Sequence, residues 1–351
     1  MSEGSSKDYN FLSAYQTDRL IMLWTGICRS DSFTAPIGRN IRAVVSFGTQ
    51  IIYVIALMNY VITNSSNLLK ILQPLLLTFT TVNVLGKTAA FAINADVFTE
   101  LDELMSDDVL YGTARETKIF MKKKIASSVW IAKCYRIWTM QALLAYLLTP
   151  FVMPLLGYRM ESIIFPWNTN NITHYLLANI LQGFCGIIVT TLNTTTDTIF
   201  AILCSISATE LRVLKTNFQT LDFVSDGSFR RAELKRNLKL YNKIQEISNA
   251  IENMYTYGLL AQFLGGAVII CLTAFVLVSV VNTDENLEDT LIKNSFNILY
   301  FIYIILQVSI YCLYGHEVMT QSNDINEAIY LSNWYKSDKA FLNNFIILRE
   351  R

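Results

Sequence analysis

The feature that most constrains this chain is a series of apolar runs, each about 20 residues long, separated by polar segments. A helix of roughly that length crosses the hydrocarbon core of a bilayer. The composition agrees, because 52% of the 351 residues are hydrophobic and only 16% are charged, whereas soluble domains carry about a quarter charged residues. The sequence therefore predicts an all-α, polytopic membrane bundle.

Six spans are predicted, over residues 41–63, 71–94, 137–157, 175–205, 255–281 and 295–315. The preceding segment, 1–40, is polar and is predicted to be a cytosolic N-terminal arm. No short apolar stretch with a cleavage site precedes the first span, so no cleaved signal peptide is expected. Residues 316–351 are predicted to form a cytosolic anchor and the start of an incomplete seventh helix.

The distribution of basic residues predicts the orientation of the bundle. Most of the 28 lysines and arginines lie in the two termini and in the two long polar segments between spans, whereas the three opposite loops hold only Lys70, Arg159 and Lys293. Because basic loops stay on the cytosolic side, the N-terminus is predicted to be cytosolic. The glycosylation acceptors Asn64 and Asn171 then lie outside. This layout is inverted relative to that of a G-protein-coupled receptor.

Other classes of function lack support in the residues. The formal net charge is zero, so the basic patch that nucleic-acid binding requires is missing. The two histidines, His174 and His316, have no neighbours at metal-ligand or triad spacing, and no phosphate-binding or hydrolase motif occurs. We expect neither an enzyme nor a cofactor or metal site. The six cysteines lie in spans or cytosolic segments, which argues against a disulfide framework.

Two ionisable residues fall inside predicted spans, Lys87 in the second and Asp197 in the fourth. Such groups are costly in the membrane and usually face the bundle interior. Lys87 lies near the cytosolic end of its span, so it either snorkels to the interface or takes part in helix pairing or gating. Asp197 follows a run of threonines, whose hydroxyls bond back to helix carbonyls. It belongs either to a packing network or to a coupling element.

A pocket for a small ligand is expected among the outer halves of the second, third, fourth and sixth spans, which are apolar and aromatic. Candidate residues recur one helical turn apart or add aromatic faces; they are Phe79, Asn83, Leu144, Leu148, Phe151, Phe184, Ile188, Tyr300 and Tyr303. Each alone is more typical of ordinary packing or of lipid-facing surface than of a pocket. Their collective position predicts the pocket.

The polar segment 222–253 has apolar residues at three- and four-residue steps, which predicts a helix. It is either a solvated hairpin or an extension of the membrane helices into a cytosolic assembly region. We favour the extension, because the apolar stripe needs a partner surface.

Two groups of motifs carry a resemblance to a known family. The C-terminal part contains Cys312-x-x-Gly315, then Ser322, then Tyr330-x-x-x-Trp334-Tyr335. The fourth span contains Thr196-Asp197-Thr198-Ile199-Phe200 and continues to Glu210-Leu211-x-x-Leu214. Together with the inverted layout, these motifs resemble the insect odorant receptor family. The layout covers nearly the whole chain, whereas the specific motifs occupy the fourth span and the C-terminal quarter.

The resemblance implies a multi-pass glycoprotein in the plasma membrane of sensory neurons. Such a subunit assembles with a shared co-receptor into a tetrameric, nonselective cation channel that volatile ligands open. It also implies a pocket among the second, third, fourth and sixth helices, and a cytosolic subunit anchor at Gly315, Ser322, Tyr330, Trp334 and Tyr335. Family members continue past the position of Arg349 into a pore-lining helix, and this sequence stops at Arg351, so we expect that helix to be lacking.

Three alternatives stay open. A gustatory-type receptor channel shares the inverted layout. A small-solute transporter would have internal repeats with interrupted helices, and none is evident. A G-protein-coupled receptor requires the opposite orientation.

Overall fold

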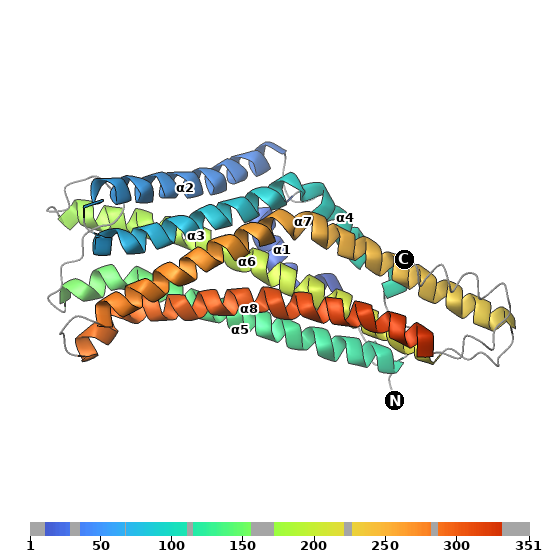
Figure 1. Ribbon diagram of the computed structural model, residues 1–351. Coiled ribbons are helices and arrows are strands. Elements are labelled where there is room, and N and C mark those ends of the chain that lie inside the picture. Colours follow the sequence, from blue (N-terminus) through green and yellow to red (C-terminus); the bar gives the residue numbers. More distant parts are fainter. Residues whose placement is uncertain are drawn as a thin grey trace, which may run out of the picture.

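The computed structural model describes residues 11–28, 36–66, 68–110, 115–155, 172–220, 227–281 and 287–331. The elements in chain order are η1 (Phe11–Ala14), α1 (Gln16–Trp24), α2 (Pro36–Thr63), α3 (Leu68–Ile93), α4 (Ala95–Met105), η2 (Asp108–Leu110), α5 (Arg115–Leu155), α6 (Ile172–Gln219), α7 (Gly227–Val281) and α8 (Leu287–Leu331). No strand occurs in these ranges. The all-helical bundle predicted from the apolar runs is confirmed (Figure 1).

Five helices are long and apolar enough to cross a membrane, over Ile37–Thr63, Ile71–Ile93, Thr173–Gln219, Ala232–Val278 and Asn297–Leu331. Each overlaps one of the predicted spans over most of its length. The predicted span 137–157 lies in α5, which is not among the five, and its last two residues lie outside the described ranges.

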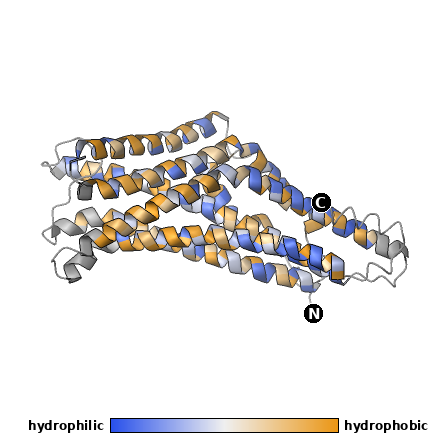
Figure 2. Ribbon diagram, in the orientation of Figure 1, coloured by the Kyte–Doolittle hydropathy of each residue, from blue (hydrophilic) through white to orange (hydrophobic). Residues whose placement is uncertain are grey.

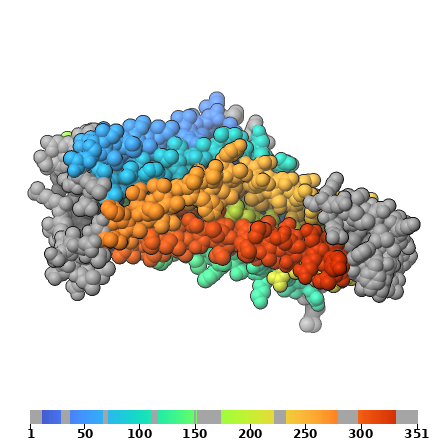
Figure 3. All heavy atoms as spheres, in the orientation of Figure 1, coloured from blue at the N-terminus to red at the C-terminus, as the bar shows by residue number. Residues whose placement is uncertain are grey.

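Much of the apolar surface of these helices faces outward. On α2 the exposed fraction of the outward isoleucines and valines reaches 72% at Ile37 and 70% at Val44. Helices α2, α3, α7 and α8 lie side by side on the face seen in Figure 3. Soluble monomers rarely expose an apolar surface of this extent. The protein is a multi-pass membrane protein whose outer face needs lipid or a partner.

The longest helices extend well beyond the apolar part of the bundle. Helix α7 has 55 residues, which gives a length of about 80 Å at 1.5 Å per residue, far more than a bilayer core. Apolar residues dominate at one end of the bundle and polar residues increase toward the other (Figure 2). From residue 227 the polar segment is therefore continuous with the membrane helix. Its apolar stripe, including Leu234, Ile244 and Ile247, is buried, and α4, η2 and α6 contact α7.

Helix α6 is the centre of the bundle. Every residue from 192 to 211 is buried, and a helix buried on all sides must be enclosed by other helices. Helices α1, α2, α3, α5, α7 and α8 all contact it. Polar residues on this part of α6 therefore need partners from the surrounding helices.

A tight turn after α1 holds that short helix against the bundle. Gly26 has a φ of +76°, a conformation that glycine adopts without strain. A Cβ at this position would lie 2.6 Å from the Ala43 backbone nitrogen and 2.6 Å from the Arg39 carbonyl oxygen. The turn thus requires glycine for both reasons, and it places α1 beside α6.

Candidate functional site

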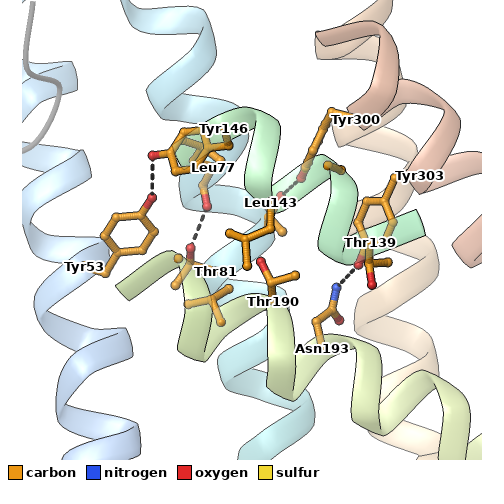
Figure 4. Close-up of a pocket in the computed structure, with 14 residues that line it drawn as sticks. Tyr53, Leu77, Thr81, Thr139, Leu143, Tyr146, Thr190, Asn193, Tyr300 and Tyr303 are labelled. Carbon is orange, nitrogen blue, oxygen red and sulfur yellow. Dashed lines mark hydrogen bonds between the residues drawn. The ribbon is translucent and has the colours of Figure 1, made fainter. Parts of the chain in front are cut away.

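A cavity of about 70 Å³ lies inside the helix bundle. Its lining residues come from α2, α3, α5, α6 and α8; they are Tyr53, Leu77, Thr80, Thr81, Thr139, Ala142, Leu143, Tyr146, Gly186, Val189, Thr190, Asn193, Tyr300 and Tyr303 (Figure 4). The lining is apolar with hydroxyls and one amide, and no lining residue carries a charge. Such a composition suits a small neutral molecule.

Helical periodicity explains how α5 and α6 contribute to the lining. Residues 139, 142, 143 and 146 of α5, and residues 186, 189, 190 and 193 of α6, repeat at steps of three, four and seven. These steps place each set on one face of its helix. Gly186 keeps space open between the two faces, because a Cβ there would already lie 3.6 Å from the Tyr146 ring and 3.7 Å from the Leu143 side chain.

Hydrogen bonds between helices fix two sides of the cavity. The Tyr53 and Tyr146 hydroxyl oxygens lie 3.2 Å apart, and the Gln182 amide donates to the Tyr146 hydroxyl. On the neighbouring side, the Thr80 and Tyr300 hydroxyls are bonded to each other. These contacts join α2 to α5, α5 to α6, and α3 to α8, so the aromatic walls have defined positions.

Asn193 connects the cavity to a neighbouring group of buried polar side chains. Its amide nitrogen donates to the Tyr303 hydroxyl, which also lines the cavity (Figure 4). Its amide oxygen accepts from Lys87 Nζ at 2.9 Å and from Gln307 Nε2 at 3.2 Å. One side chain therefore contacts both the cavity lining and a buried cation.

Lys87 forms an ion pair with Asp197 at 2.8 Å, and their side chains are 4% and 0% exposed. The carboxylate also accepts hydrogen bonds from Tyr135 at 2.8 Å, Gln307 at 2.7 Å and Tyr311 at 2.5 Å. Lys87 therefore does not snorkel to the interface, because its ammonium is neutralised inside the bundle. A buried pair is tolerated where further hydrogen bonds complete its partners, and this pair joins α3 to α6.

A second buried carboxylate, Asp18 of α1, contacts α6 at Thr198, one residue beyond Asp197. Asp18 accepts a hydrogen bond from Thr198 at 2.7 Å and forms an ion pair with Arg136 of α5. Burial raises the pKa of the Asp18 carboxyl, while the Arg136 guanidinium opposes that shift. Sequence reasoning missed this contact, because nothing in the nine residues of α1 indicates which element it packs against.

The candidate pocket residues occupy three kinds of position. Tyr300 and Tyr303 line the cavity. Asn83 is buried and donates to Gln262 of α7 at 2.9 Å, and Ile188 packs against the core. The others are on the outer surface of the chain, with exposed fractions of 38% for Phe79, 55% for Leu144, 48% for Leu148, 44% for Phe151 and 52% for Phe184.

Sequence reasoning did not find most of the cavity residues. Tyr53 was missed because the first predicted span was not considered, and Tyr146 because aromatic residues occur throughout the spans. Thr190 and Asn193 had a usable signal, since polar residues within an apolar span usually face the bundle interior. The remaining candidates are placed as follows: Gly315 is half-buried and Ser322 and Tyr330 are exposed on α8, Asn64 is half-buried just after α2, and Trp334, Tyr335 and Asn171 lie outside the described residues.

Comparison with known proteins identifies the family. The family model described as 7tm odorant receptor matches residues 67–351. The chain is 26% identical over 177 residues to odorant receptor 47a of Drosophila melanogaster, which is 50% of this chain and 43% of that receptor. It is 26% identical over 121 residues to the putative odorant receptor 92a of the same species, 33% of this chain and 27% of that protein. The chain thus matches less than half the length of either relative.

Two solved structures have the same fold. The insect olfactory receptor OR5 from Machilis hrabei matches with a TM-score of 0.78 at 14% identity, covering 98% of this chain and 91% of that one. The same receptor in complex with eugenol matches with a TM-score of 0.79, also at 14% identity and with the same coverage. The resemblance seen in the motifs is confirmed, and because the family model covers well over half of the sequence, the chain belongs to the 7tm odorant receptor family, a family of insect receptors.

Proposed function

We propose that this chain is an odorant receptor subunit that binds a small, volatile, neutral ligand in the cavity between α2, α3, α5, α6 and α8. Ligand binding opens a nonselective cation channel, which the chain forms with a shared co-receptor subunit in the plasma membrane of sensory neurons. The N-terminus is cytosolic, as the basic residues indicate.

The observation that carries this proposal is the cavity itself. It lies among five helices, its lining has no charged residue, and four tyrosines give it aromatic walls. Ligand pockets in proteins combine apolar and aromatic walls with a few placed polar groups. The Machilis hrabei receptor of the same fold, whose structure includes a complex with eugenol, supports a small organic molecule as the ligand.

The route from ligand to channel is proposed to begin at Asn193. A ligand that displaces the Asn193 amide changes the hydrogen bonds of Tyr303 and Lys87 together, because both bond to this side chain. Lys87 and Asp197 in turn hold α3 against α6. This placement favours a coupling role for Asp197 over a purely structural one.

Assembly with a co-receptor is supported by the surface at the end of α8. Met319, Tyr330 and Leu331 are 55%, 67% and 65% exposed, although this part of α8 lies in the polar half of the bundle (Figure 2). Exposed apolar side chains outside the lipid zone mark contact surfaces for other proteins. Met319 and Leu331 thus extend the proposed subunit anchor of Gly315, Ser322, Tyr330, Trp334 and Tyr335.

Whole-cell current recording tests this function. Cells expressing the chain with and without the family co-receptor receive a panel of volatile compounds while G-protein signalling is blocked. A rapid cation current that needs both chains is expected. Surface-expressed complexes that respond to no compound, or a response that G-protein blockade abolishes, would contradict the proposal.

A further inference from the structure

The hydroxyl groups of the cavity differ in whether they are already bonded. Thr80, Thr81 and Thr139 each donate to a carbonyl of their own helix, at 2.9 Å to Leu76, 2.8 Å to Leu77 and 2.9 Å to Arg136. Threonines in membrane helices commonly satisfy their hydroxyls in this way. These three donors are therefore not available to a ligand without breaking a bond.

Thr190 is the exception among the four threonines of the lining. Its hydroxyl forms no hydrogen bond with any residue in the part of the chain that the structure describes, and its side chain is half-buried. In Figure 4 it extends from α6 toward Leu143 of α5, on the opposite wall of the cavity. A hydroxyl in an apolar enclosure costs free energy unless it has a partner, so a ligand atom that accepts its proton gains affinity.

The surroundings of Thr190 define the ligand that would fit. The neighbouring lining is apolar and consists of Leu143, Val189 and Gly186. Asn193 lies one helical turn from Thr190 on the same face of α6. The Asn193 amide oxygen is occupied by Lys87 and Gln307 and its amide nitrogen donates to Tyr303, so the Thr190 hydroxyl is the donor that a ligand can use at this end of the cavity. A charged ligand would find no opposite charge among the lining residues.

Resting on the proposed function, we infer that Thr190 is a specificity-determining residue that donates a hydrogen bond to the oxygen of a small neutral ligand. The ligand class is a ketone, ester, ether or alcohol with a compact hydrocarbon body. A hydrocarbon of the same shape binds in the same cavity without this contact.

The test compares ligands that differ only at the accepting atom. Two pairs serve as probes: cyclohexanone with methylenecyclohexane, and acetophenone with α-methylstyrene, in which a methylene group replaces the carbonyl oxygen. The protein is the full chain assembled with its co-receptor. Binding is measured as ligand-induced thermal stabilisation of the purified complex, and gating as concentration–response curves for current.

The key variant is Thr190→Val, which keeps the shape of the side chain and removes the hydroxyl. Thr190→Ser keeps the hydroxyl, and Thr81→Val is a matched control, because the Thr81 hydroxyl also lines the cavity but already donates to the Leu77 carbonyl. We expect Thr190→Val to weaken ketone binding by about 3- to 10-fold, the range of one net hydrogen bond. Binding of the methylene partners should change by less than about twofold, and Thr190→Ser should retain the preference for ketones.

The outcomes separate the inference from the proposed function. Equal effects of Thr190→Val on the ketones and on their methylene partners would overturn the role of Thr190 and leave the cavity as a ligand site. An equal loss of ketone preference in Thr81→Val would overturn it as well. If the wild-type complex responds to other volatile compounds but to neither ketone, the inference is overturned and the proposed function stands. If it responds to no compound of the volatile panel, the proposed function fails, and the inference fails with it.

Discussion

Replacing Asp197 with asparagine tests whether the Lys87–Asp197 pair holds the centre of the bundle together. The side chains have the same shape, but Asp197→Asn removes the charge that neutralises Lys87 and leaves one oxygen for the four donors that now bond the carboxylate, which belong to Lys87, Tyr135, Gln307 and Tyr311. Removing one partner of a buried pair typically costs about 3–5 kcal/mol, because the other charge stays buried. The exposed fractions of 4% and 0% put this pair in that class.

The assay is unfolding of the purified chain in detergent, followed by tryptophan fluorescence. A matched control is Asp324→Asn, because Asp324 also pairs with a lysine at 2.8 Å, but the two side chains are 30% and 28% exposed. Partly exposed pairs contribute about 0–1 kcal/mol. We therefore expect a large loss of stability for Asp197→Asn and a small one for Asp324→Asn.

The double variant Lys87→Met with Asp197→Asn supplies the refuting result. Removing both charges leaves no uncompensated ion, so the double variant should be no less stable than Asp197→Asn alone. If the double variant loses as much stability as the single variants Lys87→Met and Asp197→Asn lose together, the two residues do not interact. If Asp197→Asn costs no more than Asp324→Asn, the ion pair does not stabilise the bundle.

Three further changes follow from the structure. Gly26→Ala should lower stability by at least about 1–2 kcal/mol, because the positive φ of this turn disfavours a Cβ and backbone atoms lie 2.6 Å from it; wild-type thermal stability would contradict this. Glu210→Met should increase the free energy of unfolding by roughly 1–3 kcal/mol and raise the melting temperature, since neither Glu210 carboxylate oxygen has a partner among the described residues. A lower melting temperature would mean that Glu210 has a partner in the assembled receptor. Tyr146→Phe should lower the free energy of unfolding by about 1–3 kcal/mol, because the Gln182 amide loses its acceptor. Unchanged thermal unfolding would mean that this hydrogen bond does not stabilise the bundle.

The helical fold was largely predictable because apolar runs of membrane-spanning length are a strong signal. Each predicted span overlaps a helix, although the span 71–94 ends one residue past α3 and the span 137–157 extends past the described end of α5. The polar segment after residue 94 was harder to interpret, since hydropathy gives no sign that α5 begins at Arg115 and continues without interruption into the membrane zone. Long helices that cross from lipid into water have mixed composition, and only their packing shows that they are continuous.

The cavity was less predictable, because apolar helices can face the interior on any side. Phe184 and Ile188 were chosen on α6, whereas the cavity is lined by Gly186, Val189 and Thr190, which are rotated by part of a turn. Periodicity does not fix that rotation when lipid and core are both apolar. The residues that do fix it are polar ones such as Asn193, whose hydrogen bonds require a defined direction.

A variant that fills the cavity tests whether the cavity is the ligand site. Gly186→Leu places a side chain where a Cβ already meets Tyr146 and Leu143, whereas Gly48→Leu on α2 adds the same atoms where nothing lies within 4 Å. Concentration–response curves would be recorded for both variants, with the co-receptor and with surface expression matched. Gly186→Leu should abolish the response to an activating volatile compound, and Gly48→Leu should leave it unchanged. A normal response from Gly186→Leu would mean that the ligand binds elsewhere.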